Sequence, residues 1–258
     1  MSSSWEIYDR LIDGIAPEAR ASACLVGSTW TVVESDGMGL AMTYRAGAHD
    51  GNPPSSLAGR SLRELAAYVK SWDLREASLG MAAINAFYNN PGRLRTWVTR
   101  PLELLRSAGA FTSALKEVEG KKVAVIGHFP GLEAMAAHCE LSIFEREPRT
   151  GDLPDFAAEY VLPLQDFVFI TGTTLTNKTL PRLLTLSSAA KVSLVGPTVP
   201  LVPWWFEHAI DLLAGSVVID KPAVWKSCLE GAHRGIFDAG AWMVDIRPAD
   251  LVGSTQRP

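Results

Sequence analysis

The stretch from Gly120 to Pro130, with the sequence GKKVAVIGHFP, constrains the fold more than any other part of the chain. Its centre, Val123–Ile126, is a continuous apolar run, which is typical of a strand buried on both faces of a parallel sheet. In such sheets, ligands bind beyond the carboxyl ends of the strands. Gly127, His128 and Phe129 follow the run directly, so a site is expected at these residues.

The remainder of the second half repeats this pattern of short apolar strands and helical segments. Strands are expected over residues 123–126, 140–144, 167–171, 191–195, 216–219 and 242–246, and helices over 132–138, 156–160, 180–187, 204–213 and 223–231. Strand–helix alternation implies right-handed crossovers and a parallel sheet covered on both faces. The second half is therefore predicted to be α/β, a Rossmann-like domain with a doubly wound parallel sheet.

The first half has a different character. A helix is expected over residues 5–15, strands over 23–27, 30–33 and 38–44, and helices over 61–72 and 74–88. The strands are joined by a turn signal at Asp36-Gly37, which predicts an antiparallel hairpin. Residues 46–59 are rich in Gly, Pro, Ser, Asn and Asp and are predicted to form a loop. We therefore expect a small α+β domain over residues 1–112 and the α/β domain over residues 113–258.

Charge and hydropathy exclude several classes of function. The net charge is only -4 and no lysine or arginine cluster is present, so neither nucleic acid nor an anionic membrane is an expected partner. No apolar run reaches the roughly 18–20 residues of a membrane span. The first residues do not have the pattern of a secretory signal, and a cytoplasmic location is expected. The three cysteines are far apart in sequence, which argues against a structural zinc site.

The loop after the first strand of the second half gives the first candidate residues. His128 could act as a base or as a metal ligand, or could simply be hydrogen-bonded in a turn. The loop is not G-x-G-x-x-G, because only Gly127 and Gly131 are present, so it argues against ordinary NAD binding. Glu145, at the end of the second strand, has the spacing of an acidic residue that accepts from a ribose hydroxyl. A solvated surface glutamate is the competing interpretation.

The ends of the third and fourth strands carry further polar residues and glycine. They supply Thr171, Thr173, Asn177 and Lys178 after the third strand, and Gly196 and Pro197 after the fourth. A helix N-terminus beside a lysine is a good anion site, so Lys178 is expected to hold an anionic group. Thr173 and Asn177 would orient the ligand, although Asn177 or Thr179 could instead cap the helix that follows.

The first half supplies two further candidate residues, Asn85 and Glu76. Asn85 lies in a helix of mostly small residues, and its amide needs partners there. The partner is either another backbone or a ligand in a cleft between the domains. Glu76 lies three residues after Asp73, which is the spacing of a capping box and explains Glu76 structurally. At about 100° per residue, Glu76 and Asn85 also lie on opposite faces of the helix.

Several segments in the right order resemble one family across nearly the whole chain. They are WEIYD at 5–9, KSW at 70–72, EASLG at 76–80, AINA at 83–86, VIGHFP at 125–130, NKTLP at 177–181 and LVGP at 194–197. Together they are similar to the family described as putative heavy-metal chelation. The resemblance implies a domain like the N-terminal domain of enolases joined to a Rossmann-like domain. It further implies a site between the two domains and a role with heavy-metal chelates or cofactors.

The resulting hypothesis is a binding protein for a small anionic molecule or a metal chelate; whether it is an enzyme stays open. His128 would be the metal ligand or base, Lys178 would hold an anionic group, and Glu76 is retained through the resemblance alone. The ligand contacts would come from Asn85, Gly127, Phe129, Glu145, Thr171, Thr173, Asn177, Gly196 and Pro197. A divalent transition metal or its chelate is the expected cofactor or ligand, and a homo-oligomer is a further expectation.

Two alternatives belong to other classes. One is an enzyme that uses S-adenosylmethionine or NAD in the biosynthesis of a metallophore or cofactor. The crevice at the strand ends and Glu145 favour it, whereas the missing glycine motif opposes it. The other is a scaffold or interaction module, which would leave the polar residues at the strand ends without a role.

Overall fold

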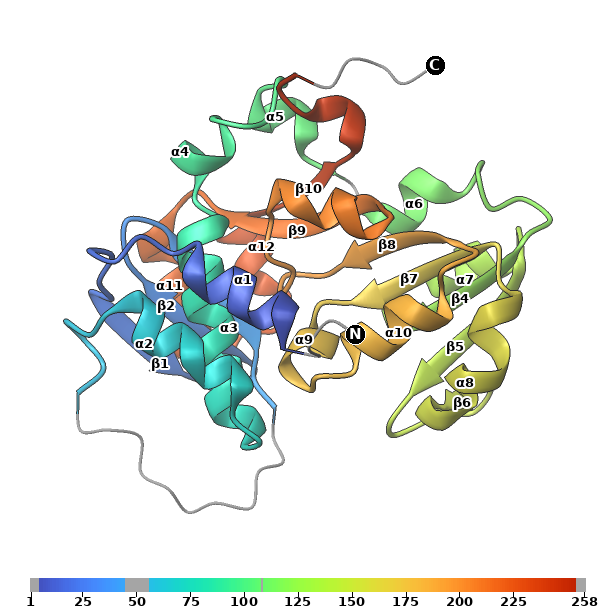
Figure 1. The fold of residues 1–258 in the computed structure, drawn as a ribbon, viewed down its shortest axis with the longest axis horizontal. Coiled ribbons are helices and arrows are strands. Elements are labelled where there is room, and N and C mark those ends of the chain that lie inside the picture. The colour runs from blue at the N-terminus through green and yellow to red at the C-terminus, as the bar shows by residue number, and fades with distance from the viewer. Residues whose placement is uncertain (1–4, 45–55, 108, 254–258) are drawn as a thin grey trace.

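The computed structural model describes residues 5–44, 56–107 and 109–253. These residues form a seven-stranded sheet and a separate three-stranded sheet, with helices around both (Figure 1). The predicted α/β class is confirmed. Most of the predicted loop over residues 46–59 lies outside the described residues.

The large sheet has the order β10-β9-β8-β7-β4-β5-β6, from β10 near the top of Figure 1 to β6 at the lower right. Its strands are β4 Lys122–Ile126, β5 Glu140–Glu145, β6 Leu153–Pro154, β7 Phe167–Thr171, β8 Lys191–Val195, β9 Ile210–Val218 and β10 Ala241–Ile246. All neighbours pair in parallel except β10, which is antiparallel to β9. The chain order reverses between β4 and β7, and this switch point is where such sheets bind ligands.

Side chains alternate between the two faces of this sheet, and each face has its own apolar cluster. On one face, Val123, Val125 and Phe169 pack with residues of α6 Ala110–Ala114 and α7 Leu132–Ala136. On the other face, Ala124, Val168 and Ile170 pack with residues of α8 Ala158–Val161 and α10 Leu180–Leu186. The sheet is therefore doubly wound, as the continuous apolar runs predicted.

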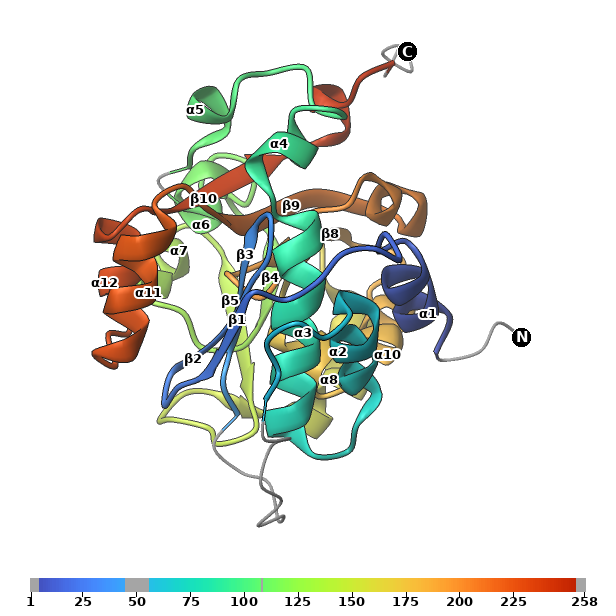
Figure 2. The same ribbon diagram turned by 90° about the vertical axis from the view of Figure 1, so that its left-hand side faces the viewer.

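The N-terminal half is built around one helix. The strands β1 Ala23–Val26, β2 Trp30–Glu34 and β3 Met38–Met42 form an antiparallel sheet, and the helical segments are α1 Glu6–Asp13, α2 Leu62–Ala67, η1 Tyr68–Lys70 and α3 Leu74–Tyr88. Figure 2 shows α3 lying across the small sheet. Two short helices, α4 Pro91–Leu94 and α5 Leu102–Leu105, then lead to α6.

The two halves share a core. One apolar cluster contains Tyr8 and Ile84 from the first half together with Val217 and Val244 from the second. The segment before α6 also reaches β10, because the Ser107 N–H donates to the Met243 carbonyl at 2.9 Å. The division into domains at residues 1–112 and 113–258 stays a prediction.

The helix expected over residues 204–213 is wrong for residues 210–213, which belong to a strand. A 3₁₀ helix, η4 Pro203–His208, is followed by β9, which lies between β8 and β10. Nearly all of β9 is buried. Its largely apolar sequence is compatible with a central strand of a sheet as well as with a buried helix. Ala209 has the left-handed φ of 56° and turns the chain between the two elements. The remaining segments after β9 are α11 Lys221–Leu229, α12 Gly235–Asp238 and η5 Pro248–Asp250.

Candidate functional site

A cavity of about 760 Å³ lies at the carboxyl ends of the parallel strands. Its volume is in the range of small-molecule sites. Ten of the residues singled out from sequence line it: Gly127, His128, Phe129, Glu145, Thr171, Thr173, Asn177, Lys178, Gly196 and Pro197. The N-terminal half contributes Trp30, Met42 and Tyr44. The cavity therefore lies at the switch point of the sheet and is lined by both halves of the chain.

His128 is paired with a buried carboxylate. Its Nδ1 lies 3.1 Å from Asp152 Oδ2, and the Asp152 side chain is only 3% exposed. Asp152 is itself fixed, because it accepts a hydrogen bond from the Arg149 N–H at 3.0 Å. A carboxylate only accepts hydrogen bonds, so Nδ1 carries the proton and a neutral imidazole keeps its lone pair on Nε2. This arrangement suits a base or a metal ligand.

Glu145 closes the same loop from the neighbouring strand. One carboxylate oxygen accepts from the His128 N–H at 2.8 Å, and the other accepts from the Arg146 N–H at 3.1 Å. The carboxylate thus holds the backbone of the loop after β4. The contact also occupies the His128 N–H, which a dinucleotide phosphate would need.

The two glycine turns at the strand ends give room to an aromatic ring. Gly127 and Gly196 have φ of 101° and 106°. A Cβ at Gly127 would lie 3.3 Å from the Phe129 ring, and one at Gly196 would lie 3.6 Å from it. Phe129 also contacts Phe111, with ring centroids 5.1 Å apart. A side chain therefore occupies the position where glycines in a dinucleotide site admit the pyrophosphate.

A hydrogen-bond network joins the N-terminal half to the short helix α9 Thr173–Thr176. The Asn177 amide donates to the Tyr44 hydroxyl at 2.9 Å, and the Tyr44 hydroxyl donates to the Thr173 carbonyl at 3.4 Å. The Thr171 and Thr173 hydroxyls lie 3.1 Å apart. Burial raises the pKa of Tyr44, so the phenol stays protonated at neutral pH. Sequence reasoning did not find Tyr44, because its partners come from distant parts of the chain.

Lys178 is held by carbonyl groups. It has the left-handed φ of 66°, and its amine donates to the Ser71 carbonyl and, at 2.8 Å, to the Thr176 carbonyl. Burial lowers the pKa of Lys178 to about 8, and the Asp73 carboxylate acts weakly in the opposite direction. Because the amine already has two backbone acceptors, Lys178 joins α9 to the start of α3 as well as lining the cavity.

Lys178 is expected to make folding more favourable as the pH rises from about 8 towards 10.5. In this range the folded protein holds a neutral amine, whereas the unfolded chain still carries the charged form, so raising the pH favours the folded state. Thermal unfolding of the native protein and of Lys178→Met across this range checks the effect. The native protein should gain stability relative to the variant; a constant difference would contradict the expectation. Lys121→Met, which removes an exposed lysine, controls for the loss of one charge.

Glu76 and Asn85 lie outside the cavity lining. Glu76 accepts a hydrogen bond from the Ser71 hydroxyl at 2.6 Å, and Asp73 caps α3 through the Arg75 N–H. Asn85 is fully buried. Its amide donates to the Leu40 carbonyl at 2.8 Å and to the Thr198 carbonyl at 3.0 Å. It joins α3 to β3 and to the loop after β8, so its contacts are with two backbones rather than with the cavity.

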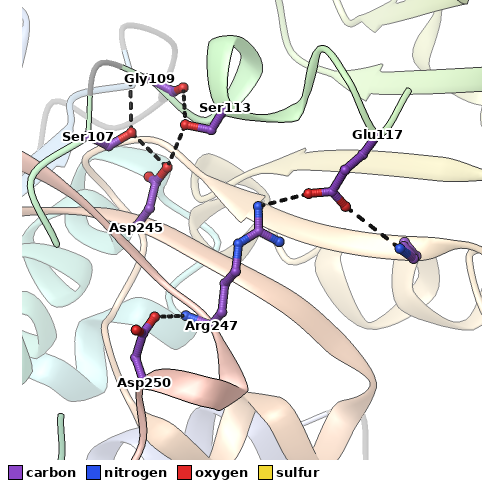
Figure 3. Close-up of polar contacts among 8 residues, drawn as sticks. Ser107, Gly109, Ser113, Glu117, Asp245, Arg247 and Asp250 are labelled. Carbon is purple, nitrogen blue, oxygen red and sulfur yellow. Dashed lines mark hydrogen bonds and ion pairs between the residues drawn. The ribbon is translucent and has the colours of Figure 1, made fainter. Parts of the chain in front are cut away.

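One wall of the cavity comes from a segment that Asp245 anchors. The Ser107 and Ser113 hydroxyls donate to the same Asp245 oxygen at 2.7 Å and 3.3 Å (Figure 3). The segment between them supplies Gly109, Ala110 and Phe111 to the lining. Burial raises the pKa of Asp245, and the two serine contacts oppose this rise. The carboxylate therefore fixes this wall to β10.

The donor set of the described residues does not make a conventional metal centre. Among residues 5–44, 56–107 and 109–253, no group of three or more His, Cys, Asp or Glu side chains could hold a metal ion. The three cysteines are free and separate. One imidazole with a free Nε2 can supply one ligand, so a metal ion bound there would need its other ligands from elsewhere.

In the described part of the chain, no helix has the length and apolarity to cross a bilayer.

The fold and the cavity define a two-part α/β protein with a ligand-sized site at the switch point of its sheet. The chain belongs to the family described as putative heavy-metal chelation, whose two models match residues 8–88 and 109–246. An uncharacterized protein of Methanocaldococcus jannaschii is 32% identical over 207 residues, which is 74% of this chain and 75% of that protein.

Two solved structures have the same fold. A protein of unknown function from the same family, from Desulfitobacterium hafniense, is 39% identical and matches 95% of this chain and 98% of its own, with a TM-score of 0.83. A second family member, from Pyrococcus horikoshii, is 22% identical and matches 94% of this chain and 99% of its own, with a TM-score of 0.73. The first confirms the resemblance seen in the sequence, and the second shows the fold alone.

Proposed function

We propose that the protein binds a small metal chelate in the cavity between its two halves. In this proposal, His128 supplies one ligand to the metal through Nε2. The observation that carries the proposal is the pair formed by His128 and the buried Asp152, which leaves one imidazole nitrogen for a ligand. The family description is consistent with a metal as the cargo.

The lining supports a chelate rather than a bare ion. The cavity contains one histidine with a carboxylate partner, whereas no three-residue donor group occurs among the described residues. Its lining includes several aromatic rings, among them Phe111, Phe129 and Phe156. An apolar lining with a few fixed polar groups is typical of sites for organic molecules. The organic part of the chelate would therefore supply most of the metal ligands and most of the apolar contact.

The nucleotide alternative has less support. Phe129 occupies the space beside both glycine turns, and Glu145 binds the N–H group of the first loop. Both features oppose a pyrophosphate at the end of β4. A thermal-shift screen with NAD and S-adenosylmethionine is expected to give no shift, whereas a bound nucleotide at about 100 times its dissociation constant would add about 2.7 kcal/mol.

Loss of the His128 imidazole should weaken chelate binding. A suitable probe is copper(II) held by terpyridine, a planar apolar chelate with one open in-plane position for an imidazole. We expect His128→Ala to lower the affinity by about tenfold or more, because an imidazole ligand to the metal is lost. Calorimetric titration of untagged protein measures the affinity, and the visible absorption band reports the imidazole ligand.

The matched control is His138→Ala. His138 also pairs with a carboxylate, Glu119 at 2.7 Å, but it lies outside the cavity lining. This variant should bind the chelate as the native protein does. Metal-free terpyridine should bind the native protein and His128→Ala equally. Equal affinity of the copper chelate for the native protein and His128→Ala would overturn the proposal, and so would an equal loss in both histidine variants.

A further inference from the structure

The cavity is lined by soft donor atoms as well as by carboxylates. The carboxylates in its lining, Glu145, Asp155 and Glu159, come from β5 and from the helical segment after β6. Met42, Met243 and His233 line the same cavity. Met243 and Glu145 are well separated in the large sheet, because β10 is one edge strand and β5 lies next to the other. The thioethers therefore offer a different chemistry from the His128 site.

Trp30 connects Met42 to His233. Trp30 and Met42 are direct cross-strand partners in β2 and β3, so their side chains lie on the same face of the small sheet. The Trp30 indole N–H donates to the His233 carbonyl at 2.9 Å. The two rings lie 6.1 Å apart at an angle of 32°. Trp30 is 3% exposed, so its position is fixed by packing.

Met243, in strand β10 of the large sheet, lies near the apolar cluster that contains Trp30. Ala241, the first residue of β10, packs in one apolar cluster with Trp30, and Met42 and Phe237 pack against this cluster. Met243 is two residues further along β10, so it lies on the same face as Ala241. Met42, Met243, His233 and Phe237 all line the cavity. Three separate segments of the chain thus bring two thioethers and one imidazole to the lining of one cavity, and two of them, Met42 and His233, adjoin Trp30.

This combination of donors selects one class of metal. Thioether sulfur is a soft ligand that suits Cu⁺, and imidazole binds copper as well. None of the three donors is a thiol, so a monovalent cation would not have to displace a thiol proton. An aromatic face beside the donors would add a cation–π contact. Hard cations such as Mg²⁺ prefer carboxylate and carbonyl oxygen to thioether sulfur.

We propose that Met42, Met243 and His233 form a binding site for a soft monovalent cation, Cu⁺ or Ag⁺, beside the Trp30 ring. The site is independent of the chelate proposed at His128, since it uses no residue of the His128–Asp152 pair. His233 is exposed, whereas both methionines are partly buried. The imidazole is therefore the donor through which an ion would enter from a carrier in solution.

Competition for Cu⁺ with a chromogenic chelator, without oxygen, measures the affinity. The cysteines would also bind Cu⁺, so the test uses a background with Cys24→Ser, Cys139→Ser and Cys228→Ala. In this background we expect one Cu⁺ per chain. Met42→Leu combined with Met243→Leu should lower the affinity by about tenfold or more, and so should His233→Ala. Met81→Leu, in the buried core, should not change it.

A second measurement uses the same cysteine-free background, because Cys139 contacts Met135 and Cys228 packs with Met38. Methyl NMR of labelled methionine, with Ag⁺ added, should shift the signals of Met42 and Met243 and leave those of Met38, Met81 and Met135 in place. The proposal is overturned if neither signal shifts, or if the leucine and alanine variants bind Cu⁺ as tightly as their background. His128→Ala should retain the Cu⁺ site, which separates the failure of this proposal from the failure of the chelate proposal.

Discussion

Replacing Gly39 by valine is expected to destabilise the protein by about 4 kcal/mol or more, since changes of this size come from severe overpacking. Gly39 lies in β3 beneath α3. A Cβ at this position would lie 2.1 Å from the Ala82 carbonyl oxygen and 2.1 Å from the Ala86 nitrogen. Both atoms belong to the helix backbone, so neither can move without displacing α3. The strand and the helix must therefore separate, or the protein must unfold.

Urea and thermal unfolding measure this effect. For a chain of this size, about 4 kcal/mol lowers the melting temperature by about 8–16 °C. Gly92→Ala is the matched control, because a Cβ there would meet only the Asn90 side-chain oxygen, at 3.1 Å. The control should melt close to the native temperature. Native stability in Gly39→Val would show that α3 can move away from β3.

The same change should also abolish ligand binding at the cavity. Met42 and Tyr44 follow Gly39 in the chain and line the cavity from the N-terminal half. Displacement of β3 would remove the Tyr44 hydroxyl from its contacts with Asn177 and Thr173. The close approach of α3 to β3 is thus a requirement for the site as well as for the fold.

The sequence was sufficient to locate the cavity, because the end of each parallel strand can be recognised where its apolar run stops. Each of β4, β7 and β8 is a short apolar run, and the residues after it must lie at one edge of the sheet. Ten of the candidate residues therefore line one cavity. The small residues of α3 leave room for neighbouring backbone: a Cβ at Gly80 in α3 would lie 2.1 Å from the Val69 nitrogen, and one at Gly39 in β3 would lie 2.1 Å from the Ala82 carbonyl oxygen.

The partners of these residues could not be predicted, because they depend on tertiary contacts. Asp152 pairs with His128 across 24 residues, and Tyr44 reaches Asn177 across 133. From sequence, Lys178 is expected to bind an anion, because it lies beside a helix N-terminus. In the structure, its amine donates to the backbone carbonyls of Ser71 and Thr176. Local pattern specifies which side chains reach an edge of the sheet, whereas the fold decides what each one binds.

The error over residues 204–213 has the same physical origin. The run IDLLAGSVV is apolar except for Asp211 and Ser216, and a largely apolar run does not separate a buried strand from a buried helix. The segment forms a strand because β8 and β10 both pair with it through backbone hydrogen bonds. Asn85 was also ambiguous from sequence, since its amide needed either another backbone or a ligand.

Replacing Asn89 by leucine is expected to cost about 3–5 kcal/mol, since each buried polar group left without a partner costs about 1–3 kcal/mol. Asn89 is 1% exposed at the end of α3. Its amide donates to the Val199 carbonyl at 2.9 Å and to the Ser216 carbonyl at 3.0 Å. Its side-chain oxygen accepts from the Leu201 N–H at 2.8 Å. One side chain thus binds the loop after β8 and strand β9 to the N-terminal half.

Asn90→Ala is the control that distinguishes the contacts of Asn89 between the two halves from ordinary helix capping. Asn90 caps α4 through the Gly92 N–H at 2.7 Å, and loss of such a cap costs about 1 kcal/mol. Urea unfolding should therefore rank Asn89→Leu well below Asn90→Ala. Hydrogen exchange should show faster exchange at Leu201 in Asn89→Leu alone, because its N–H loses its acceptor. Equal stability of the two variants would mean that the halves are held together by apolar packing, and that the amide of Asn89 adds little to it.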